Sequence, residues 1–299
     1  MDFYFSRFEH RQPPEPLKTP RWVMMTWQVL AVAALILGAN YIYWRWTASL
    51  NTDALWYAIP LVLAETLAWI GTVLFTINLW KEEDPPQNPP PGEINDCLRP
   101  EDAEASRPIK VDLFIATYSE DVELVRLSIR DAMKVVYPGP LDFKVHVLDD
   151  GRRPEMKAVC EEEGANYITR QTNIGFKAGN LRNGLEQTDG DFLVICDADT
   201  RVFPTLLSHT LGYFRDPDVA WVQTPQWFFD LPEGESLPRW LGRKVGKAGY
   251  GLGWLAQKFI GPVTVGRDPF FNDPRMFYDV ILRRRNWANA AFCCGAASI

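Results

Sequence analysis

The sequence predicts an α/β domain with a mostly parallel sheet and helices on both faces, preceded by two transmembrane helices. Two observations predict this class. Two long apolar stretches lie near the N-terminus, and from Lys110 onward short apolar runs alternate with helical patterns. Such alternation is typical of right-handed crossovers between parallel strands. The 299 residues suffice for one large domain or two small ones.

The two apolar stretches have the length of membrane spans. Residues 22–44 contain no charged side chain, and a helix of this length covers about 34 Å, enough to cross a bilayer. Residues 55–79 are interrupted only by Pro60 and Glu65. A pair of buried core helices is the weaker interpretation, because soluble helices rarely lack a polar face over such a length. We therefore expect two transmembrane helices within residues 22–80.

The basic residues beside these stretches predict their orientation. Four precede the first stretch: Arg7, Arg11, Lys18 and Arg21. The loop between the stretches carries only Arg45. By the positive-inside rule, residues 1–21 are cytoplasmic, the loop is outside, and the chain after Lys81 is cytoplasmic again. We expect a multi-pass protein of the inner (plasma) membrane, with the lipid bilayer as a partner and the α/β domain in the cytoplasm.

Charge and cysteine content argue against two other functional classes. The formal net charge is −7 and no basic domain stands out, so we expect no nucleic-acid partner. The five cysteines show no paired spacing typical of zinc sites: Cys97, Cys160, Cys196, Cys293 and Cys294. In a reducing cytoplasm they are expected to be free thiols.

The remaining chain divides into a linker and the α/β domain. Residues 81–108 are rich in proline and predict a stiff linker. Residues 109–299 are expected to form the domain. Its strands are predicted at 111–116, 143–148, 166–169, 191–196 and 219–223. Its helices are predicted at 121–136, 154–164, 176–187 and 204–214.

Polar residues follow three of the predicted strands. Thr117, Tyr118 and Glu120 follow the first, Asp149 and Asp150 the second, and Asp197 and Asp199 the fourth. Ligands of parallel sheets bind outside the carboxyl ends of the strands, so these side chains are expected to converge at one edge.

Asp197 and Asp199 are candidate metal ligands. A hard divalent cation held by one or two carboxylates usually completes its shell with substrate phosphates, and it stabilises a diphosphate leaving group. An Asp-x-Asp alone is more often a turn or a helix cap. Its position after an apolar strand, together with a second acidic pair after another strand, favours the metal interpretation.

Two further groups suit a nucleotide. A carboxylate of Asp149 or Asp150 can accept a hydrogen bond from a nucleobase imide or a ribose hydroxyl. The alternative interpretation is that Asp-Asp-Gly only forms a turn. Lys177 lies at a predicted helix start, where a lysine and free amides suit an anion. A solvated surface lysine is the alternative.

Five motifs together resemble one family. ATYSED (116–121), VLDDG (147–151), GFKAGNLRNGL (175–185), VICDAD (194–199) and VQTPQWF (222–228) occur in the order seen in processive family 2 glycosyltransferases. They are most similar to bacterial cellulose synthases, whose catalytic domain has the GT-A Rossmann-like fold. The resemblance is dense over residues 109–230 and resumes at residues 292–295.

The resemblance implies roles for individual residues. UDP would contact Thr117, Tyr118, Glu120, Asp149, Asp150 and Lys177. Asp197 and Asp199 would hold Mg²⁺ or Mn²⁺ and the diphosphate. The acceptor glucan would lie beside Gln223, Gln226, Trp227 and Cys294. The implied partners are UDP-glucose, a glucan acceptor, and periplasmic or regulatory subunits of a synthase complex.

The sequence departs from the family pattern in three places. Phe292-Cys-Cys-Gly-Ala296 lacks the serine of the usual Phe-Phe-Cys-Gly-Ser, which puts the acceptor contact there in doubt. Residues 231–275 match nothing specific in the family. The stretch 239–261 is glycine-rich, basic and aromatic, which suits either a membrane surface or a mobile loop. No Thr-Glu-Asp triplet or Gln-x-x-Arg-Trp motif occurs, so the catalytic base is expected after Ile299 and the chain is expected to be truncated and inactive alone.

Three functions remain open at this point. The first is an inverting transferase that, in complete form, adds glucose from UDP-glucose to a β-1,4-glucan. The second is a synthase of another polysaccharide, such as a mixed-linkage, chitin-like or hyaluronan-like polymer. The third is a catalytically inactive nucleotide-binding membrane protein.

Overall fold

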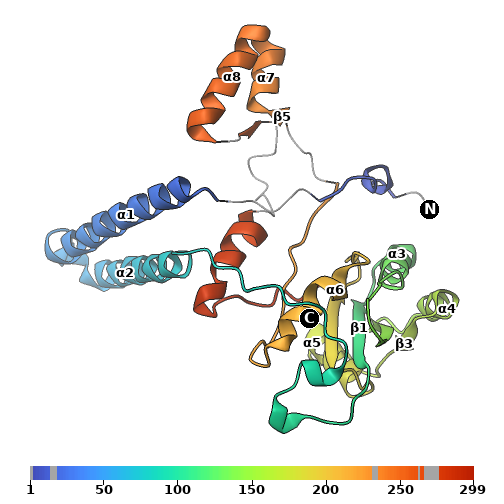
Figure 1. Cartoon of the computed structure of the whole chain (residues 1–299). Helices are drawn as coiled ribbons and strands as arrows, with labels where there is room; N and C mark the ends of the chain where they lie inside the picture. The colour runs from blue at the N-terminus through green and yellow to red at the C-terminus, as the bar shows by residue number, and fades with distance from the viewer. Residues whose placement is uncertain (1–2, 14–18, 231–234, 262, 266–275) are drawn as a thin grey trace. The chain divides into compact units, whose positions relative to one another are not determined.

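The computed structural model describes residues 3–13, 19–230, 235–261, 263–265 and 276–299 (Figure 1). The chain separates into two compact units. Residues 83–224 and 289–299 form the sheet unit, and residues 1–82 and 225–288 form the helical unit. The domain boundaries expected from the sequence stay predictions.

A four-stranded parallel sheet organises the sheet unit. Its strands are β1 (Ile109–Thr117), β2 (Leu141–Asp149), β3 (Asn166–Ile168) and β4 (Phe192–Asp197). Their order is β3-β2-β1-β4, and every adjacent pair is parallel. The chain thus builds outward from β1 to β3 on one side and then returns to add β4 on the other.

Helices cover both faces of this sheet, because its strands present apolar side chains on each face. Ile109, Val111, Leu113 and Ile115 of β1 lie in one buried cluster. This cluster also contains side chains of α3 (Val122–Ala132), α4 (Pro154–Glu163) and α6 (Leu206–Thr210).

The opposite face of the sheet has a smaller core. Phe114 of β1 and Leu148 of β2 are fully buried there, with Leu181 of α5 (Phe176–Leu185) packed against them. The predicted α/β class, with a mostly parallel sheet, helices on both faces and two long apolar helices before it, is confirmed.

Local signals explain where the helices begin and end. The Asp121 side chain accepts a hydrogen bond from the amide of Glu123 (2.8 Å), which caps the start of α3. Pro154 occupies the first turn of α4, where its missing N–H costs nothing. Gly164 ends α4 with φ 80°, a left-handed conformation that favours glycine.

One expectation along the sheet unit was confirmed and one was wrong. Helical structure covers most of the predicted helix at 204–214, as α6 followed by a 3-10 helix, η5 (Leu211–Arg215). Residues 219–223 do not form a strand of the main sheet. Instead, the Val222 amide and carbonyl exchange hydrogen bonds with Ile299 (2.9 and 3.0 Å), and Ser298 bridges antiparallel to Gln223 and to Ile195 of β4.

The proline-rich segment packs against the sheet unit. It contains two 3-10 helices, η3 (Ile94–Asp96) and η4 (Pro100–Asp102). The Tyr137 hydroxyl donates to the Pro91 carbonyl (2.6 Å), and Arg215 Nε donates to the Pro89 carbonyl (2.8 Å). Consecutive prolines lack backbone N–H groups and cannot form a regular helix or strand. These side-chain hydrogen bonds therefore satisfy carbonyls that have no backbone partner.

Two helices dominate the first part of the helical unit. They are α1 (Arg21–Thr47) and α2 (Leu55–Asn78). By length and composition both suffice to cross a membrane, and almost none of the residues in their apolar stretches is buried within the protein. Arg45 Nε pairs with Glu65 Oε2 (2.6 Å), so the single acidic residue of α2 lies against a basic residue of α1.

A helical hairpin follows residue 235. It consists of α7 (Leu237–Val245) and α8 (Lys247–Ile260) (Figure 1). A mobile loop was one of two expectations for residues 239–261, and it was wrong, because helix covers almost all of this stretch.

Shorter elements complete the helical unit. They are η1 (Ser6–Phe8), η2 (Thr52–Ala54), the strands β5 (Glu235–Ser236) and β6 (Thr264–Val265), the π-helix η6 (Met276–Leu282) and η7 (Asn286–Ala288).

Candidate functional site

The carboxyl ends of β1, β2 and β4 carry the predicted polar residues. Strand register places Thr117 beside Asp149, and Ala116 beside Asp197. The order β3-β2-β1-β4 reverses direction between β1 and β4, and ligands of open α/β sheets bind at such a switch point. The polar cluster therefore lies where the sheet topology favours a binding crevice.

The turn after β1 is shaped by the carboxylate of Glu120. Its Oε2 accepts from the Thr117 hydroxyl (2.8 Å) and from the amides of Tyr118 (2.7 Å) and Ser119 (3.1 Å). Partial desolvation raises the pKa of Glu120, but these hydrogen bonds outweigh it and hold the pKa below its usual value. The Tyr118 ring is left exposed above this turn.

Asp149 is buried and its oxygens are engaged by the protein. Oδ1 accepts from the Gly151 amide (2.9 Å), and Oδ2 from the Arg153 amide (2.7 Å) and the Tyr167 hydroxyl (3.0 Å). Burial, and then the neighbouring carboxylate, raise the pKa of Tyr167 to about 12. A Cβ at Gly151 would lie 2.2 Å from the Tyr118 carbonyl oxygen, so only glycine fits beside the first turn. Asp149 therefore sets the shape of this loop.

Asp150 forms a two-point ion pair with Arg170. Both carboxylate oxygens lie 2.7 Å from guanidinium nitrogens, and both side chains are largely buried. The same guanidinium donates to the carbonyls of Ile174 (2.7 Å) and Phe176 (2.9 Å), which lead into α5. Asp150 thus fixes the start of α5 through Arg170.

Arg153 joins the first two strands at this edge. Its Nη2 donates to the Thr117 hydroxyl (2.8 Å), its Nη1 to the Glu120 carbonyl (2.6 Å), and its Nε to Asp149 Oδ1 (3.2 Å). Neither Arg153 nor Arg170 was predicted from the sequence. For Arg153 the only available signal was a basic residue close in sequence to an acidic pair, which is common on protein surfaces.

Lys177 extends from the first turn of α5 to the end of β4. Its ammonium pairs with Asp197 Oδ1 and donates to the Gly295 carbonyl (2.8 Å). The preceding residue, Phe176, is 85% exposed and has φ 48°, an uncommon backbone conformation for a side chain of this size. The sequence analysis did not identify Phe176 as part of this edge.

Asp197 and Asp199 meet the basic requirement for a divalent cation. Asp197 is the last residue of β4, and Asp199 lies in the turn that follows, where it is exposed. Within the described residues, no group of three or more His, Cys, Asp or Glu side chains forms a complete metal site. Two carboxylates nevertheless fit a cation whose remaining ligands come from substrate phosphates. Lys177 pairs with Asp197, so the charge of this carboxylate is balanced within the protein.

Gln223 and Cys294, two of the residues predicted to lie beside the acceptor, are in contact with each other. Gln223 Oε1 accepts from the Cys294 amide (2.7 Å), and its Nε2 donates to the Ala296 carbonyl (2.9 Å). Because Lys177 also contacts Gly295, the structure brings Gln223, Cys294 and Asp197 into one connected group. Gln226 and Trp227 belong to the helical unit, where the Trp227 ring lies 6.0 Å from that of Phe229.

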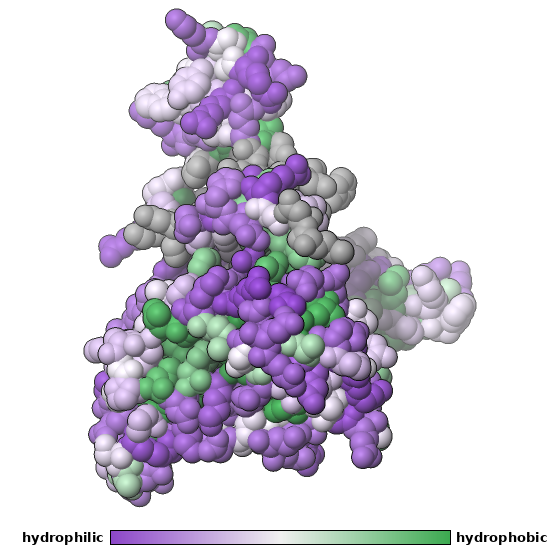
Figure 2. Space-filling view, turned by 90° about the vertical axis from the view of Figure 1, so that its right-hand side faces the viewer, coloured by the Kyte–Doolittle hydropathy of each residue, from purple (hydrophilic) through white to green (hydrophobic). Residues whose placement is uncertain are grey.

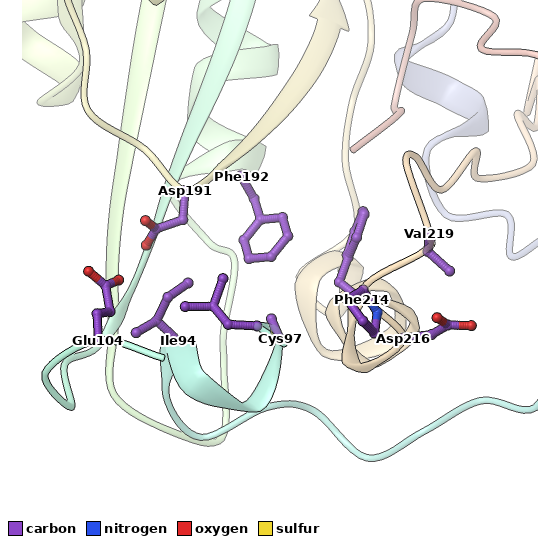
Figure 3. Close-up of a pocket in the computed structure, with 10 residues that line it drawn as sticks. Ile94, Cys97, Glu104, Asp191, Phe192, Phe214, Asp216 and Val219 are labelled. Atoms are coloured by element: carbon purple, nitrogen blue, oxygen red, sulfur yellow. The ribbon is translucent and has the colours of Figure 1, made fainter. Parts of the chain in front are cut away.

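A cavity of about 290 Å³ lies at the opposite edge of the sheet (Figure 3). Its lining includes Asp191 and Phe192, where β4 begins, together with Cys97, Glu104 and Asp216. Burial raises the pKa of the Cys97 thiol to about 11, which makes it a poor nucleophile. Three carboxylates line this cavity, namely Glu104, Asp191 and Asp216, and they disfavour a diphosphate there.

Comparison with known sequences identifies the family of the chain. The profile of glycosyl transferase family 2 matches residues 112–286. The cellulose synthase catalytic subunit [UDP-forming] of Pseudomonas fluorescens (strain SBW25) is 28% identical over 286 residues, covering 90% of this chain and 32% of its own length. The corresponding subunit of Xanthomonas axonopodis pv. citri (strain 306) is 30% identical over 275 residues, with 89% and 32% covered. Cellulose synthase 1 of Komagataeibacter xylinus is 36% identical over 190 residues, with 63% and 10% covered.

Among solved structures, a mannosyltransferase from Pyrobaculum calidifontis in complex with GDP-Man and Mn²⁺ matches with a TM-score of 0.38. It is 18% identical, and 68% of this chain and 48% of that chain are covered. This chain spans no more than about a third of the length of the curated relatives named above. The family profile nevertheless covers more than half of the 299 residues, including all four strands except the start of β1. The chain therefore belongs to glycosyl transferase family 2.

Proposed function

We propose that this chain is the donor-binding part of a membrane glycosyltransferase that transfers glucose from UDP-glucose to a growing β-1,4-glucan. The observation that carries the proposal is the convergence of Thr117, Asp149 and Asp197 on adjacent strand ends, with Lys177 contacting Asp197. The cellulose synthase subunits of Pseudomonas and Xanthomonas align with nine tenths of this chain, which supports this substrate class.

The donor nucleotide would bind over the ends of β1 and β2. The exposed Tyr118 ring offers an apolar face for a base. Thr117, Glu120 and Asp149 are already hydrogen-bonded, so their contribution is to hold this surface in shape. Asp150 contributes through Arg170, which sets the position of α5 and hence of Lys177.

The diphosphate would lie near the end of β4. Asp197 and Asp199 would hold Mg²⁺ or Mn²⁺, which neutralises the charge of the UDP leaving group. Lys177 adds a positive charge at the first turn of α5, where helix amides also favour an anion. Single displacement at the sugar carbon, with inversion, needs a base to remove the acceptor proton. No residue described above is assigned that role.

The acceptor would approach from the side of Gln223 and Cys294. Their mutual hydrogen bond lies beside Gly295, whose carbonyl contacts Lys177. An acceptor hydroxyl placed there would be close to the donor sugar. Gln226 and Trp227 follow directly in the chain, and Trp227 would offer an aromatic surface to a sugar ring.

The two long apolar helices would place the protein in the inner membrane. Basic residues precede α1, whereas the loop before α2 has none after Arg45, so the sheet unit would lie in the cytoplasm. UDP-sugars would reach the carboxyl edge of the sheet from that side. A synthase complex would supply periplasmic or regulatory subunits as further partners.

Isothermal titration calorimetry of the full chain in nanodiscs tests the nucleotide site. UDP binding is expected to strengthen with Mg²⁺ or Mn²⁺, and Asp199→Asn is expected to remove that metal dependence. Asp102→Asn, an exposed carboxylate in η4, is the matched control. Equal metal dependence in the Asp199 variant would overturn the metal assignment. Tighter binding of UDP-N-acetylglucosamine than of UDP-glucose would move the proposal to another polymer.

A further inference from the structure

The α7–α8 hairpin is closely packed on its inner side. Gly249 and Gly253 of α8 are buried against α7, and a Cβ on either would lie within 2.6 Å of α7 backbone atoms. Glycine at these two positions therefore lets the helices approach each other closely. The contact with α7 accounts for one face of α8 only.

A second face of α8 carries an apolar stripe that the hairpin does not cover. Ala248, Leu252, Leu255 and Phe259 follow one another at spacings of four, three and four residues, which puts them on one side of a helix. Leu252 is 62% exposed and Phe259 is 74% exposed. We call these four residues the α8 stripe.

The charge of the hairpin is opposite to that of the whole chain. Residues 237–260 include five basic residues and no acidic one: Arg239, Arg243, Lys244, Lys247 and Lys258. The formal net charge of the protein is −7. Figure 2 shows hydrophilic and apolar residues side by side over this hairpin, at the top of the view.

Aromatic residues flank the stripe. Trp254 and Tyr250 are each about half exposed, and the Lys258 ammonium lies 4.0 Å from the centroid of the Trp254 ring. Trp and Tyr rings beside Lys or Arg are typical of helices that lie at the boundary between water and lipid headgroups.

Arg243 pairs with Glu235, just before α7 (2.7 Å), so its charge is compensated within the protein. We propose that the α8 stripe binds the surface of an anionic lipid bilayer, with the lysines of the hairpin contacting lipid phosphates. Apolar side chains of this size gain free energy by leaving water for the acyl boundary, and the lysines add electrostatic attraction. A second copy of the hairpin is disfavoured as the occupant, because it would bring two surfaces of net positive charge together. Helices α1 and α2, long and apolar enough to span a bilayer, would keep such a surface within reach.

Site-specific photo-crosslinking in nanodiscs tests the lipid contact. A benzophenone amino acid is placed at position 255 or 259 of the full chain, and lipid adducts are measured by mass spectrometry. Adduct yield is expected to be several-fold higher in phosphatidylglycerol-containing discs than in phosphatidylcholine discs, and to fall with added salt. The same probe at Arg182, whose side chain is 82% exposed on α5, is the control.

Variants without lysine charges test how much electrostatic attraction contributes to the lipid contact. Lys244→Gln with Lys247→Gln is expected to lower the adduct yield in anionic discs by up to about fivefold per lysine. Lys134→Gln with Lys157→Gln, two lysines of the sheet unit, should leave it unchanged. Crosslinks to a second chain in place of lipid, or equal yields in the two disc types, would overturn the proposal.

Discussion

Lys177, in the first turn of α5, is paired with Asp197 at the end of β4, and its ammonium also donates to the Gly295 carbonyl. One side chain thereby connects a helix, the central sheet and the last described segment of the chain. In the function proposed above, a divalent cation at Asp197 would take the position of this ammonium, so lysine and metal would compete for the same carboxylate.

Replacing Lys177 separates these two roles. Lys177→Met is expected to weaken UDP binding by about 10- to 100-fold, because a charge-assisted hydrogen bond to phosphate contributes about 1.5–3 kcal/mol. In the absence of nucleotide, the same variant should bind Mn²⁺ more tightly, since Asp197 loses its competing cation. Calorimetry measures both effects, and Lys157→Met on α4 is the matched control. Unchanged UDP affinity would remove Lys177 from the nucleotide site.

Breaking the pair between Asp150 and Arg170 should destabilise the sheet unit. Asp150→Ala leaves a buried guanidinium without its carboxylate, which costs about 3–5 kcal/mol. The melting temperature of the chain in nanodiscs is expected to fall by several degrees. Asp189→Asn is the comparison, because that carboxylate pairs with Lys110 and Lys144 at an exposed site, where ion pairs contribute little. Equal effects of the two variants would contradict the buried role of Asp150.

Glu120 gives the turn after β1 a defined pH dependence. Its pKa is lower in the folded protein than its ordinary value of 4.5, so its contribution to stability is complete above that value. The contribution is lost as the pH falls through the lower, folded-state pKa. Urea unfolding of the wild-type chain should therefore require less denaturant at acidic pH, with Glu120→Gln showing a weaker dependence there. Identical pH profiles for the two proteins would count against this assignment.

The pair between Arg45 and Glu65 predicts a strongly non-additive double-mutant cycle. A lone charge at the centre of a membrane helix costs about 2.5–3.5 kcal/mol. Glu65 lies near the middle of α2, so Arg45→Leu, which leaves it unpaired, should destabilise the helix pair in nanodiscs. Glu65→Leu alone should cost less, because Arg45 lies in the last turn of α1. The double variant Arg45→Leu with Glu65→Leu should recover most of that loss. Additive losses would show that the two side chains do not neutralise each other in the bilayer.

The orientation proposed for the membrane helices can be tested by cysteine labelling in cells. An impermeant reagent is expected to label a cysteine at Asn51 or Thr52 from outside, whereas a cysteine at Asn88 should react only after the membrane is opened. Labelling of position 88 from outside would place the sheet unit away from cytoplasmic UDP-sugars.

Sequence patterns predicted the sheet well because its strands are buried on both faces. The run at 111–116 is apolar except for Asp112, and the run at 143–148 is apolar except for Lys144 and His146. Strands β1 and β2 extend these runs by only a few residues. The run at 219–223 has a similar composition but lies outside the strand order, because its partner is the segment at Ala297–Ile299. Nothing local in the sequence records such a distant partner.

The site was predictable only in part, for a related reason. Polar residues after strands can be read from the sequence, so Thr117, Asp149 and Asp197 were found. Arg170 was missed because its partner Asp150 is 20 residues away and the contact depends on the loop into α5. The α7–α8 hairpin was not predicted as helix, because glycine has low helix propensity and its role at Gly249 and Gly253 is in packing.

The chain leaves the sheet unit at Thr224 and returns to it at Asn289, and the returning segment completes the edge beside β4. The contact between Lys177 and Gly295 therefore closes a loop of 118 residues. Closure entropy grows only with the logarithm of loop length, so the intervening residues cost little equilibrium stability. Long-range closure is nevertheless slow, so the contact between Lys177 and Gly295 should be among the last to form as the chain folds.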